Sequence, residues 1–422
     1  MQEKNLEFPN IRHLLAFREV ALAQGISAAA HKVHRSQPAM TQSIAGLERQ
    51  LDTALFDRQA GGMFLTPAGD LFFARVCRMF DHLAQGAREA VQMEMRQRLR
   101  QKERQKHQRP SPGFYLNTTA AQLRALVAIG QAGSFSVAAR QTGLSQPSIH
   151  RAGRDLERLA AMPFYTTTGK GVELTRPGAA FTRAVRLAKA ELQQGLDELG
   201  QLKGEDSTRI TVGSLPLSRS TILPQAIHDI LQEKAKVQLR NVDGPYPELL
   251  RALRHGDLDF LIGALRDPVA ADDVVQEPLF SDLLTVVAGP GHPLAARAGL
   301  TLKDTLAYPW IAPPRETPTG DYLYRQLGIG QMDNTPVRIV SSSLIMMRGL
   351  LARGKYLTIL SQHQATLEIS LGQIVPLAVT LPDSARPIGL TYRAGWLPTA
   401  TQTRFLDLIR AAANRPGYTQ NE

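Results

Sequence analysis

The chain has 422 residues and a formal net charge of +11, and a single core seldom organises such a length, so two or three domains are expected. One cysteine, Cys77, excludes an intramolecular disulfide framework. The charged start is followed by no apolar signal run, and the apolar segments are too short or too interrupted to cross a bilayer. We therefore expect a cytoplasmic protein that is not inserted in a membrane.

The excess positive charge lies in the N-terminal half. Residues 1–204 contain 28 Lys and Arg against 17 Asp and Glu, whereas residues 205–422 contain 21 of each kind. Basic surface gains free energy on a phosphate backbone through counterion release, so this distribution favours a nucleic-acid partner for the first half. A solvated basic surface would give the same count.

Three helices are expected near the start of the chain, around residues 14–17, at 27–33 and from Ser36 onward. Ser36 is a suitable N-cap, and Pro38 fits the first turn of the third helix. The apolar residues of that helix follow a helical spacing and share one face, and the remaining side chains carry amide, hydroxyl and guanidinium groups: Gln37, Thr41, Gln42 and Arg49. Such a face suits insertion into the major groove of DNA.

A long helix is expected after Pro67. Its apolar positions approximate a heptad seam: Phe73, Cys77, Phe80, Ala84, Ala87, Val91 and Met95. A basic run from Arg96 to Arg109 then ends at Pro110-Ser111-Pro112-Gly113, which marks a boundary.

The first segment is repeated 109 residues later. Ser36-Gln37-Pro38 recurs as Ser145-Gln146-Pro147, and Leu47-Glu48-Arg49 recurs as Leu156-Glu157-Arg158. A constant offset over about 40 residues indicates a duplicated helical unit. The outward residues of its third helix are Gln146, Ser148, His150, Arg151 and Arg154, and a second amphipathic helix runs from about Phe181 to Leu202. The apolar faces of the two long helices would be unfavourably exposed to solvent in a monomer. We therefore expect a homodimer or homotetramer.

From Arg209 onward, short strands alternate with helices in two sets, and a strand at 388–392 returns to the first set. This rhythm predicts two α/β lobes with largely parallel sheets. Ligands of such folds bind at the carboxyl ends of strands, where three polar clusters are candidates to bind an anion: Ser218, Arg219, Ser220 and Thr221; Thr317 and Thr319; and Ser341, Ser342 and Ser343. Helix capping alone would explain Ser343.

Together these motifs resemble the LysR-type transcription regulators. The resemblance is carried by Ser-Phe-Ser-x-Ala-Ala at 134–139, the repeated Ser-Gln-Pro, Leu-Glu and Leu-Thr-x-x-Gly elements, and Leu-Phe-x-Arg at 55–58. It implies winged helix-turn-helix units, dimerising linker helices and a two-lobed α/β effector domain like that of periplasmic binding proteins. It also implies that Arg58 contacts DNA from the wing. The second copy lacks that arginine, and Lys170 is either its substitute or a solvated turn residue.

The resemblance predicts five segments: a winged helix-turn-helix at 1–68, a linker helix at 69–113, a second unit at 114–178, a second linker helix at 179–204 and an effector domain at 205–415. The family does not usually carry two such units. We expect a sequence-specific regulator of double-stranded DNA that responds to a small-molecule effector, either a sugar-derived or an aromatic anion. The expected DNA contacts are Ser36, Gln37, Pro38, Thr41, Gln42 and Arg58 in the first unit, and Ser145, Gln146, Ser148, His150, Arg151 and Lys170 in the second.

Two other readings remain open at this point. One is an architectural DNA-binding protein with a vestigial sensor, and the other, for the C-terminal half alone, is a solute-binding protein. An enzyme is not expected, because the chain has no HExxH, GxSxG or Walker motif, and no cofactor or metal site is predicted.

Overall fold

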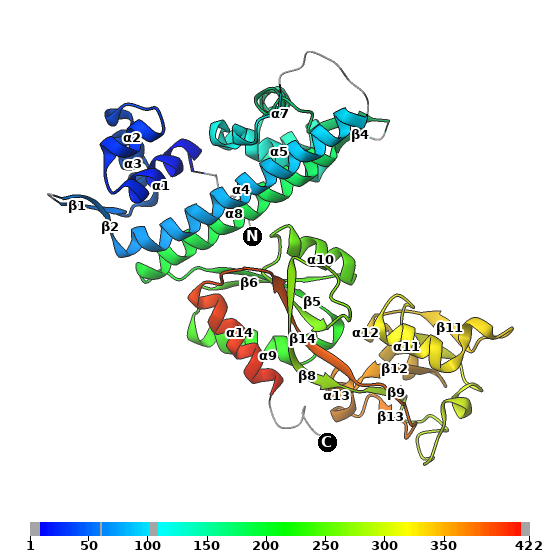
Figure 1. Cartoon of the computed structure of the whole chain (residues 1–422). Helices are drawn as coiled ribbons and strands as arrows, with labels where there is room; N and C mark the ends of the chain where they lie inside the picture. Colours follow the sequence, from blue (N-terminus) through cyan, green and yellow to red (C-terminus); the bar gives the residue numbers. More distant parts are fainter. Residues whose placement is uncertain (1–8, 60, 101–108, 170, 415–422) are drawn as a thin grey trace. The chain divides into compact units, whose positions relative to one another are not determined.

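The structure is a computed structural model that describes residues 9–59, 61–100, 109–169 and 171–414. It divides into two compact units, one comprising residues 1–208 with the turn 255–257 and the other comprising 209–254 with 258–422 (Figure 1). Among the described helices, none combines the length and the apolar character needed to span a membrane.

The first unit begins with a winged helix-turn-helix. Its elements are α1 (Ile11–Ala23), α2 (Ile26–Lys32), α3 (Gln37–Leu51) and a hairpin of β1 (Phe56–Gln59) and β2 (Gly62–Leu65). Met40, Ile44 and Leu47 are buried, as their spacing on α3 predicts, and they pack against the buried Leu14 and Phe17 of α1. The outward residues of α3 therefore face away from this core.

The second winged helix-turn-helix repeats this arrangement. Its elements are the short 3-10 helix η1 (Pro112–Asn117), α5 (Ala120–Ala132), α6 (Phe135–Thr142), α7 (Gln146–Ala160), β3 (Tyr165–Thr168) and β4 (Gly171–Leu174). Ile149 and Leu156 of α7 are fully buried, as predicted.

The Leu-Glu motif of both copies fixes the hairpin to the recognition helix. Glu48 Oε1 accepts hydrogen bonds from the amides of Leu55 and Phe56 at 2.8 and 3.2 Å. Glu157 Oε1 does the same for Phe164 and Tyr165 at 2.8 and 3.1 Å. A carboxylate that accepts two backbone amides in this way orients the strand after the helix, which explains why the glutamate recurs.

The Leu-Thr-x-x-Gly motif fixes the start of each long helix. Thr66 donates to the carbonyl of Ala54 at 2.8 Å and caps the amide of Gly69 at 2.9 Å. A Cβ at Gly69 would lie 2.1 Å from the carbonyl oxygen of Leu55, and a Cβ at Gly178 would lie 2.1 Å from that of Phe164. Each glycine is thus required by a close backbone approach.

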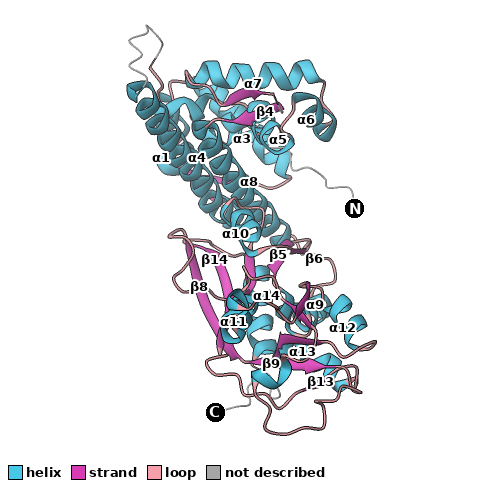
Figure 2. Ribbon diagram, turned by 90° about the vertical axis from the view of Figure 1, so that its right-hand side faces the viewer, coloured by secondary structure: helices cyan, strands magenta, loops and turns pink. Residues whose placement is uncertain are grey.

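The two long helices, α4 (Pro67–Arg100) and α8 (Arg176–Leu202), lie side by side in antiparallel order (Figure 2). Arg75 near the start of α4 bonds Gln194 near the end of α8, whereas Glu89 further along α4 pairs with Arg183 near the start of α8. A Cβ on Gly86 would lie 2.1 Å from the Cβ of Ala184, so the helices are closest at this crossing.

The predicted phase of the α4 seam is wrong. Phe80 and Ala87 are buried as expected, but the other buried apolar residues are Phe72, Val76, Met79, Leu83 and Ala90. Of the remaining predicted seam positions, four are half-buried and Met95 is exposed. The reason is that α4 buries one side against α8 and another against its own helix-turn-helix, so its apolar surface is wider than a heptad stripe. Because α4 and α8 cover each other, the two seams do not require a second chain, contrary to the expectation from the sequence.

The second unit consists of two lobes, each built on a five-stranded sheet. The first has the strand order β6-β5-β7-β14-β8 and comprises β5 (Arg209–Ser214), η2 (Pro216–Arg219), α9 (Ile222–Glu233), β6 (Gln238–Asp243), α10 (Tyr246–Arg254), β7 (Phe260–Ala264), β8 (Val274–Asp282), β14 (Arg386–Arg393) and α14 (Ala400–Ala413). The predicted parallel pairing of β5 with β6 and β7 is present. Phe260 of β7 and Phe405 of α14 lie in the core of this lobe, together with buried residues of α9.

The second lobe has the strand order β11-β10-β12-β9-β13. Its elements are β9 (Leu284–Ala288), η3 (Leu302–Thr305), β10 (Trp310–Ala312), α11 (Pro318–Leu327), η4 (Ile329–Gln331), β11 (Val337–Val340), α12 (Leu344–Leu351), β12 (Leu357–Ser361), α13 (Gln362–Ser370) and β13 (Val375–Pro376). The chain crosses between the lobes twice, from β8 to β9 and from β13 to β14, which is the predicted exit and return.

Candidate nucleic-acid interface and effector site

The recognition helix of the first copy, α3, exposes amide groups. Ser36 caps it by accepting the amide of Ala39 at 3.4 Å, and Pro38 occupies its first turn. Gln37 and Gln42 are exposed, whereas Thr41 is half-buried and donates to the carbonyl of Gln37 at 3.1 Å. The two glutamines are therefore the groups of this helix that reach outward with both donor and acceptor atoms.

The equivalent helix of the second copy, α7, exposes more basic groups. Ser145 caps the amide of Ser148 at 3.3 Å, and the two hydroxyls are 2.8 Å apart. Gln146, His150 and Arg151 are exposed, although the His150 ring also packs edge-on against Phe135, with 5.1 Å between ring centroids. The outward chemistry of the two copies thus differs in charge.

The wings differ too. Arg58 is exposed on β1, where it pairs across the hairpin with Met63. The equivalent residue of the second hairpin is the exposed Thr167. Lys170, the predicted substitute, lies outside the described residues, as does most of the basic run after Arg100.

The end of each recognition helix is held by the long helix of the other copy. Lys203, after α8, donates to the carbonyls of Leu51 and Asp52 at 3.1 and 2.6 Å. Arg98 of α4 donates to the carbonyl of Ala161 at 2.8 Å. Asp52 and Ala161 occupy equivalent left-handed positions just after α3 and α7. Because a cation satisfies the free carbonyls at each helix end, both recognition helices are tied to the helix pair.

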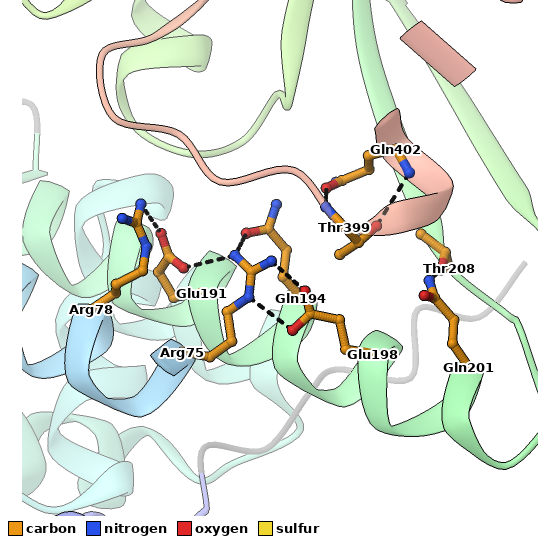
Figure 3. A network of polar contacts seen from close by, with 9 residues as sticks. All are labelled: Arg75, Arg78, Glu191, Gln194, Glu198, Gln201, Thr208, Thr399 and Gln402. Carbon is orange, nitrogen blue, oxygen red and sulfur yellow. Dashed lines mark hydrogen bonds and ion pairs between the residues drawn. The ribbon is translucent and has the colours of Figure 1, made fainter. Parts of the chain in front are cut away.

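A buried charge network joins α4 to α8 (Figure 3). Only 1% of the Arg75 side chain is exposed, and its guanidinium bonds Glu191 at 3.1 Å, Gln194 at 2.8 Å and Glu198 at 3.0 Å. Arg78 adds a second ion pair to Glu191 at 2.8 Å. Burial alone would raise the pKa of Glu191, but hydrogen bonds from His82 and Arg78 and the nearby guanidinium charges lower it to about 2.

In the second unit, the cluster after β5 reaches across to the other lobe. Thr221 shares a 2.7 Å hydrogen bond with His363 Nε2, and Ser220 donates to the carbonyl of Gln364 at 3.4 Å. Ser218 is buried and donates to the carbonyl of Leu215 at 2.8 Å, while Arg219 forms an ion pair with Asp243 at 3.1 Å. The structure thus brings Ser220 and Thr221 between the lobes.

The other two predicted clusters follow β10 and β11, which are neighbouring parallel strands of the second lobe. Thr317 caps α11 through the amide of Gly320 at 3.1 Å, and Thr319 accepts a hydrogen bond from Arg386. Ser343 caps α12 through the amide of Met346 at 3.4 Å, Ser341 accepts from the amide of Ser343, and Ser342 is exposed. Among the contacts of the described residues, none joins these three serines to the other clusters.

The two crossover segments are linked by an ion pair whose residues were not among the predicted site residues. Arg386 at the start of β14 bonds Asp282 at the end of β8 at 3.2 Å, and their side chains are 14% and 3% exposed. Asp282 also accepts the amide of His363 at 3.2 Å. No local sequence pattern indicates this pair, because the two residues are distant in sequence and β8 was not predicted.

Three buried polar atoms of the first lobe have no hydrogen-bond partner within the described parts of the chain: Ser214 Oγ, Tyr246 Oη and Arg386 Nε. Ser214 ends β5 and Tyr246 follows β6; Arg266, which follows β7, lies over the Tyr246 ring at 4.2 Å. Burial lowers the pKa of Arg266, and the charge of Arg386 lowers it further. Arg266 and Arg386 are both half-buried, and their charges together with the unused hydrogen-bonding atoms favour an anion over a cation in this part of the lobe.

Comparisons with known proteins agree with this architecture. Residues 11–70 and 120–179 each match the family described as bacterial regulatory helix-turn-helix protein, lysR family, and residues 203–414 match the LysR substrate binding domain. The chain is similar to the HTH-type transcriptional regulator GalR of Pseudomonas putida, with 31% identity over 96% of this chain and 98% of GalR. An alignment of that extent includes both helix-turn-helix segments.

Another relative is the regulator PcaQ of Agrobacterium fabrum, which is 29% identical over 69% of this chain and 94% of its own length. Among solved structures, a full-length OxyR variant from Pseudomonas aeruginosa has 22% identity and a TM-score of 0.52 over 72% of this chain and 98% of that one. This likeness concerns the fold alone. With two helix-turn-helix segments and one effector-binding domain, all matched to the same family, the chain belongs to the LysR family of bacterial transcription regulators.

Proposed function

We propose that both helix-turn-helix units of one chain contact the operator, and that the protein acts in the cytoplasm. LysR-type proteins are DNA-binding transcription regulators with an effector-binding domain, and they are not enzymes. They also form oligomers. We therefore propose a homodimer or homotetramer of this chain, assembled through surfaces other than the covered seam of α4 and α8.

The proposed contacts follow the exposed faces of the two recognition helices. Gln37 and Gln42 in the first copy and Gln146 and Arg151 in the second read base edges, while Ser36, Thr41, Ser145, Ser148 and His150 adjoin them. Arg58 and Lys170 belong to the wings, and Pro38 shapes the first turn of α3. We place the boundaries between the two DNA-binding units, the linker helices and the effector domain at residues 68, 113, 178 and 204.

The observation that carries the proposal is the exposure of Arg151. It lies on the outward face of a well-capped α7, and no described residue bonds its guanidinium. If α7 served only as a structural spacer, it would not need an exposed arginine without an ion-pair partner at this position. Arg151 is thus positioned to bind a base edge or a phosphate.

Footprinting on genomic fragments captured by the purified protein tests the role of the second copy. Arg151→Ala should shorten the protected region and weaken binding, while leaving the part read by α3 protected. Arg325→Ala, which removes an exposed arginine of the second unit, serves as the control and should change neither. Identical footprints and affinities for the parent and Arg151→Ala would mean that the second copy does not touch DNA.

For the effector, we propose an organic anion bound between the lobes by Arg266, Arg386, Tyr246 and Ser214. Support comes from the unused polar atoms and the excess positive charge at the carboxyl ends of β5, β6 and β7. The predicted residues Ser218, Arg219, Ser220, Thr221, Thr317 and Thr319 belong to the helix starts around this site. Ser341, Ser342 and Ser343 follow the neighbouring strand β11 and stay among the proposed residues, although Ser343 also caps α12.

The expected effector is a carboxylate of aromatic or sugar-derived type. Thermal unfolding followed by tryptophan fluorescence, with benzoate and gluconate as first probes and benzamide as the neutral control, measures binding to the second unit. A carboxylate should raise the midpoint, and Arg266→Gln should abolish the rise while Arg325→Gln preserves it. If a panel of such acids gives no shift, the alternative of an architectural protein with a vestigial sensor is favoured.

A further inference from the structure

The pairing of α4 with α8 repeats the same contact twice. Gly86 packs on Ala184, and Gly195 packs on Arg75, with its Cβ position 3.1 Å from the Cβ of Arg75. Gly86 and Gly195 are equivalent in the duplication, and so are Arg75 and Ala184, since each pair is 109 residues apart. The helix pair therefore has the contact pattern of a two-fold dimer, although both helices belong to one chain.

The charges of this pair are not symmetric. Arg75 and Arg78 of α4 correspond to Ala184 and Leu187 of α8, while Glu191 of α8 corresponds to His82 of α4. If two α8 helices paired in the same register, each Glu191 would face Ala184 and Leu187 and would be buried without a cation. An uncompensated buried charge is strongly unfavourable, so this pairing is disfavoured.

Pairing of two α4 helices is disfavoured for the opposite reason. Each Arg75 would then face His82 where Glu191 now lies, and both copies would lose the ion pairs to Glu191. Only α4 with α8 places Arg75 and Arg78 opposite Glu191. The network thus favours the pairing of the two unlike helices over an exchange between like helices of two chains.

This pairing also fixes the two recognition helices relative to each other. Each is tied at its end to the long helix of the other copy, through Lys203 and Arg98. The points at which the two hairpins abut their long helices, Gly69 and Gly178, are roughly 35 Å apart along the helix pair at ~1.5 Å per residue. Dimeric helix-turn-helix proteins read half-sites that lie one turn of DNA apart or a multiple of it, so two units held at a fixed separation read half-sites at a fixed spacing.

The two fixed helices carry unlike reading groups. Gln37 and Gln146 are the same residue at equivalent positions, but Gln42 corresponds to Arg151. Glutamine pairs with the major-groove edge of adenine, whereas arginine pairs with that of guanine. In a homodimer these groups would have to be identical. In a single chain they are free to differ.

We infer that this protein binds, as a single-chain counterpart of a dimer, an operator made of two dissimilar half-sites in a fixed order. The half-site beneath α3 presents adenine to Gln42, and the half-site beneath α7 presents guanine to Arg151. This inference rests on the proposed function, namely that both copies contact DNA. The operator is consequently not palindromic at these positions.

Selection of duplexes from a random pool by the full-length protein tests the inference. The parent should select two half-sites at one fixed spacing that differ at one position. Arg151→Gln should replace guanine by adenine in the second half-site and make the selected sequence more symmetric, and Gln42→Arg should do the same with guanine in the first. A duplex with two copies of the first half-site should bind the parent ~10-fold to ~100-fold more weakly than the selected one.

The outcomes separate this inference from the proposed function. Two identical half-sites, selected by the parent and altered together by either substitution, would overturn the inference and leave the proposed function intact. A single half-site that Arg151→Gln does not alter would overturn both, because the second copy would then not read DNA. Arg325→Gln, in the second unit, should leave the selected sequence unchanged and controls for the loss of one charge.

Discussion

Replacing Arg75 by methionine should strongly destabilise the first unit while leaving the second unchanged. Methionine has a similar length but no charge, so Glu191 and Glu198, whose side chains are 6% and 12% exposed, lose the cation between them. Breaking a buried ion pair from one side costs about 3–5 kcal/mol. For a unit of about 200 residues, each kcal/mol lowers the unfolding midpoint by ~2–4 °C, so a fall of roughly 6–20 °C is expected.

The chain itself provides the assay. Both tryptophans, Trp310 and Trp396, lie in the second unit, so their fluorescence follows that unit alone. Far-ultraviolet circular dichroism also follows the helices of the first unit. Arg75→Met should lower the dichroism transition only. Arg88→Met removes an exposed arginine of the same helix that bonds Gln85, and should have an effect within ~0.5 kcal/mol. Equal shifts for the two variants would refute the role of the network.

Three further changes have defined outcomes. The folded-state pKa of Glu191 is lowered to about 2 from an ordinary 4.5. Its contribution to the free energy of unfolding, up to ~3 kcal/mol, is therefore present above pH ~4.5 and is lost as the pH falls toward 2. Glu191→Gln should remove this part of the acid dependence of the dichroism transition. Gly86→Ala should lower the free energy of unfolding of the first unit by about 1–3 kcal/mol, because the two Cβ positions would be 2.1 Å apart. Ala184→Gly in the same chain should restore part of this loss. Additive losses for the two substitutions would argue against contact between these residues. Arg58→Ala should weaken binding to all duplexes and reduce the slope of log affinity against log salt by about 1. Arg58→Lys keeps the charge and should retain the slope. A loss of affinity confined to particular sequences would instead indicate that Arg58 contacts bases.

Local signals in the sequence were sufficient to predict the recognition helices. Ser36 and Ser145 cap them, a proline occupies the first turn, and the spacing of Met40 and Ile44 defines the inner face, all within a few residues of one another. The strands that alternate with helices in the second unit were predicted for the same reason. In contrast, β8 was missed because it lies at a sheet edge, contains Pro278 and has a register shift, so its apolar residues do not alternate regularly.

What the sequence could not show is which distant segments meet. The seam of α4 was predicted one residue out of phase at most positions, because contacts with both α8 and the helix-turn-helix determine which residues are buried. Likewise, Arg386 and Asp282 lie 104 residues apart, and only the two crossings of the chain bring them together. Unused hydrogen-bonding atoms such as Ser214 Oγ become visible only once the tertiary structure is known.

The antiparallel pairing of α4 and α8 within one polypeptide has a consequence for how the regulator competes for its sites in the cell. Two helix-turn-helix units joined in one chain do not separate on dilution. Binding of the second unit to its half-site is therefore intramolecular, at an effective concentration set by the helix pair. Engagement of both half-sites by one chain therefore does not depend on the concentration of a second chain. Assembly into the proposed homodimer or homotetramer would then join pairs of half-sites that each chain already holds in a fixed order.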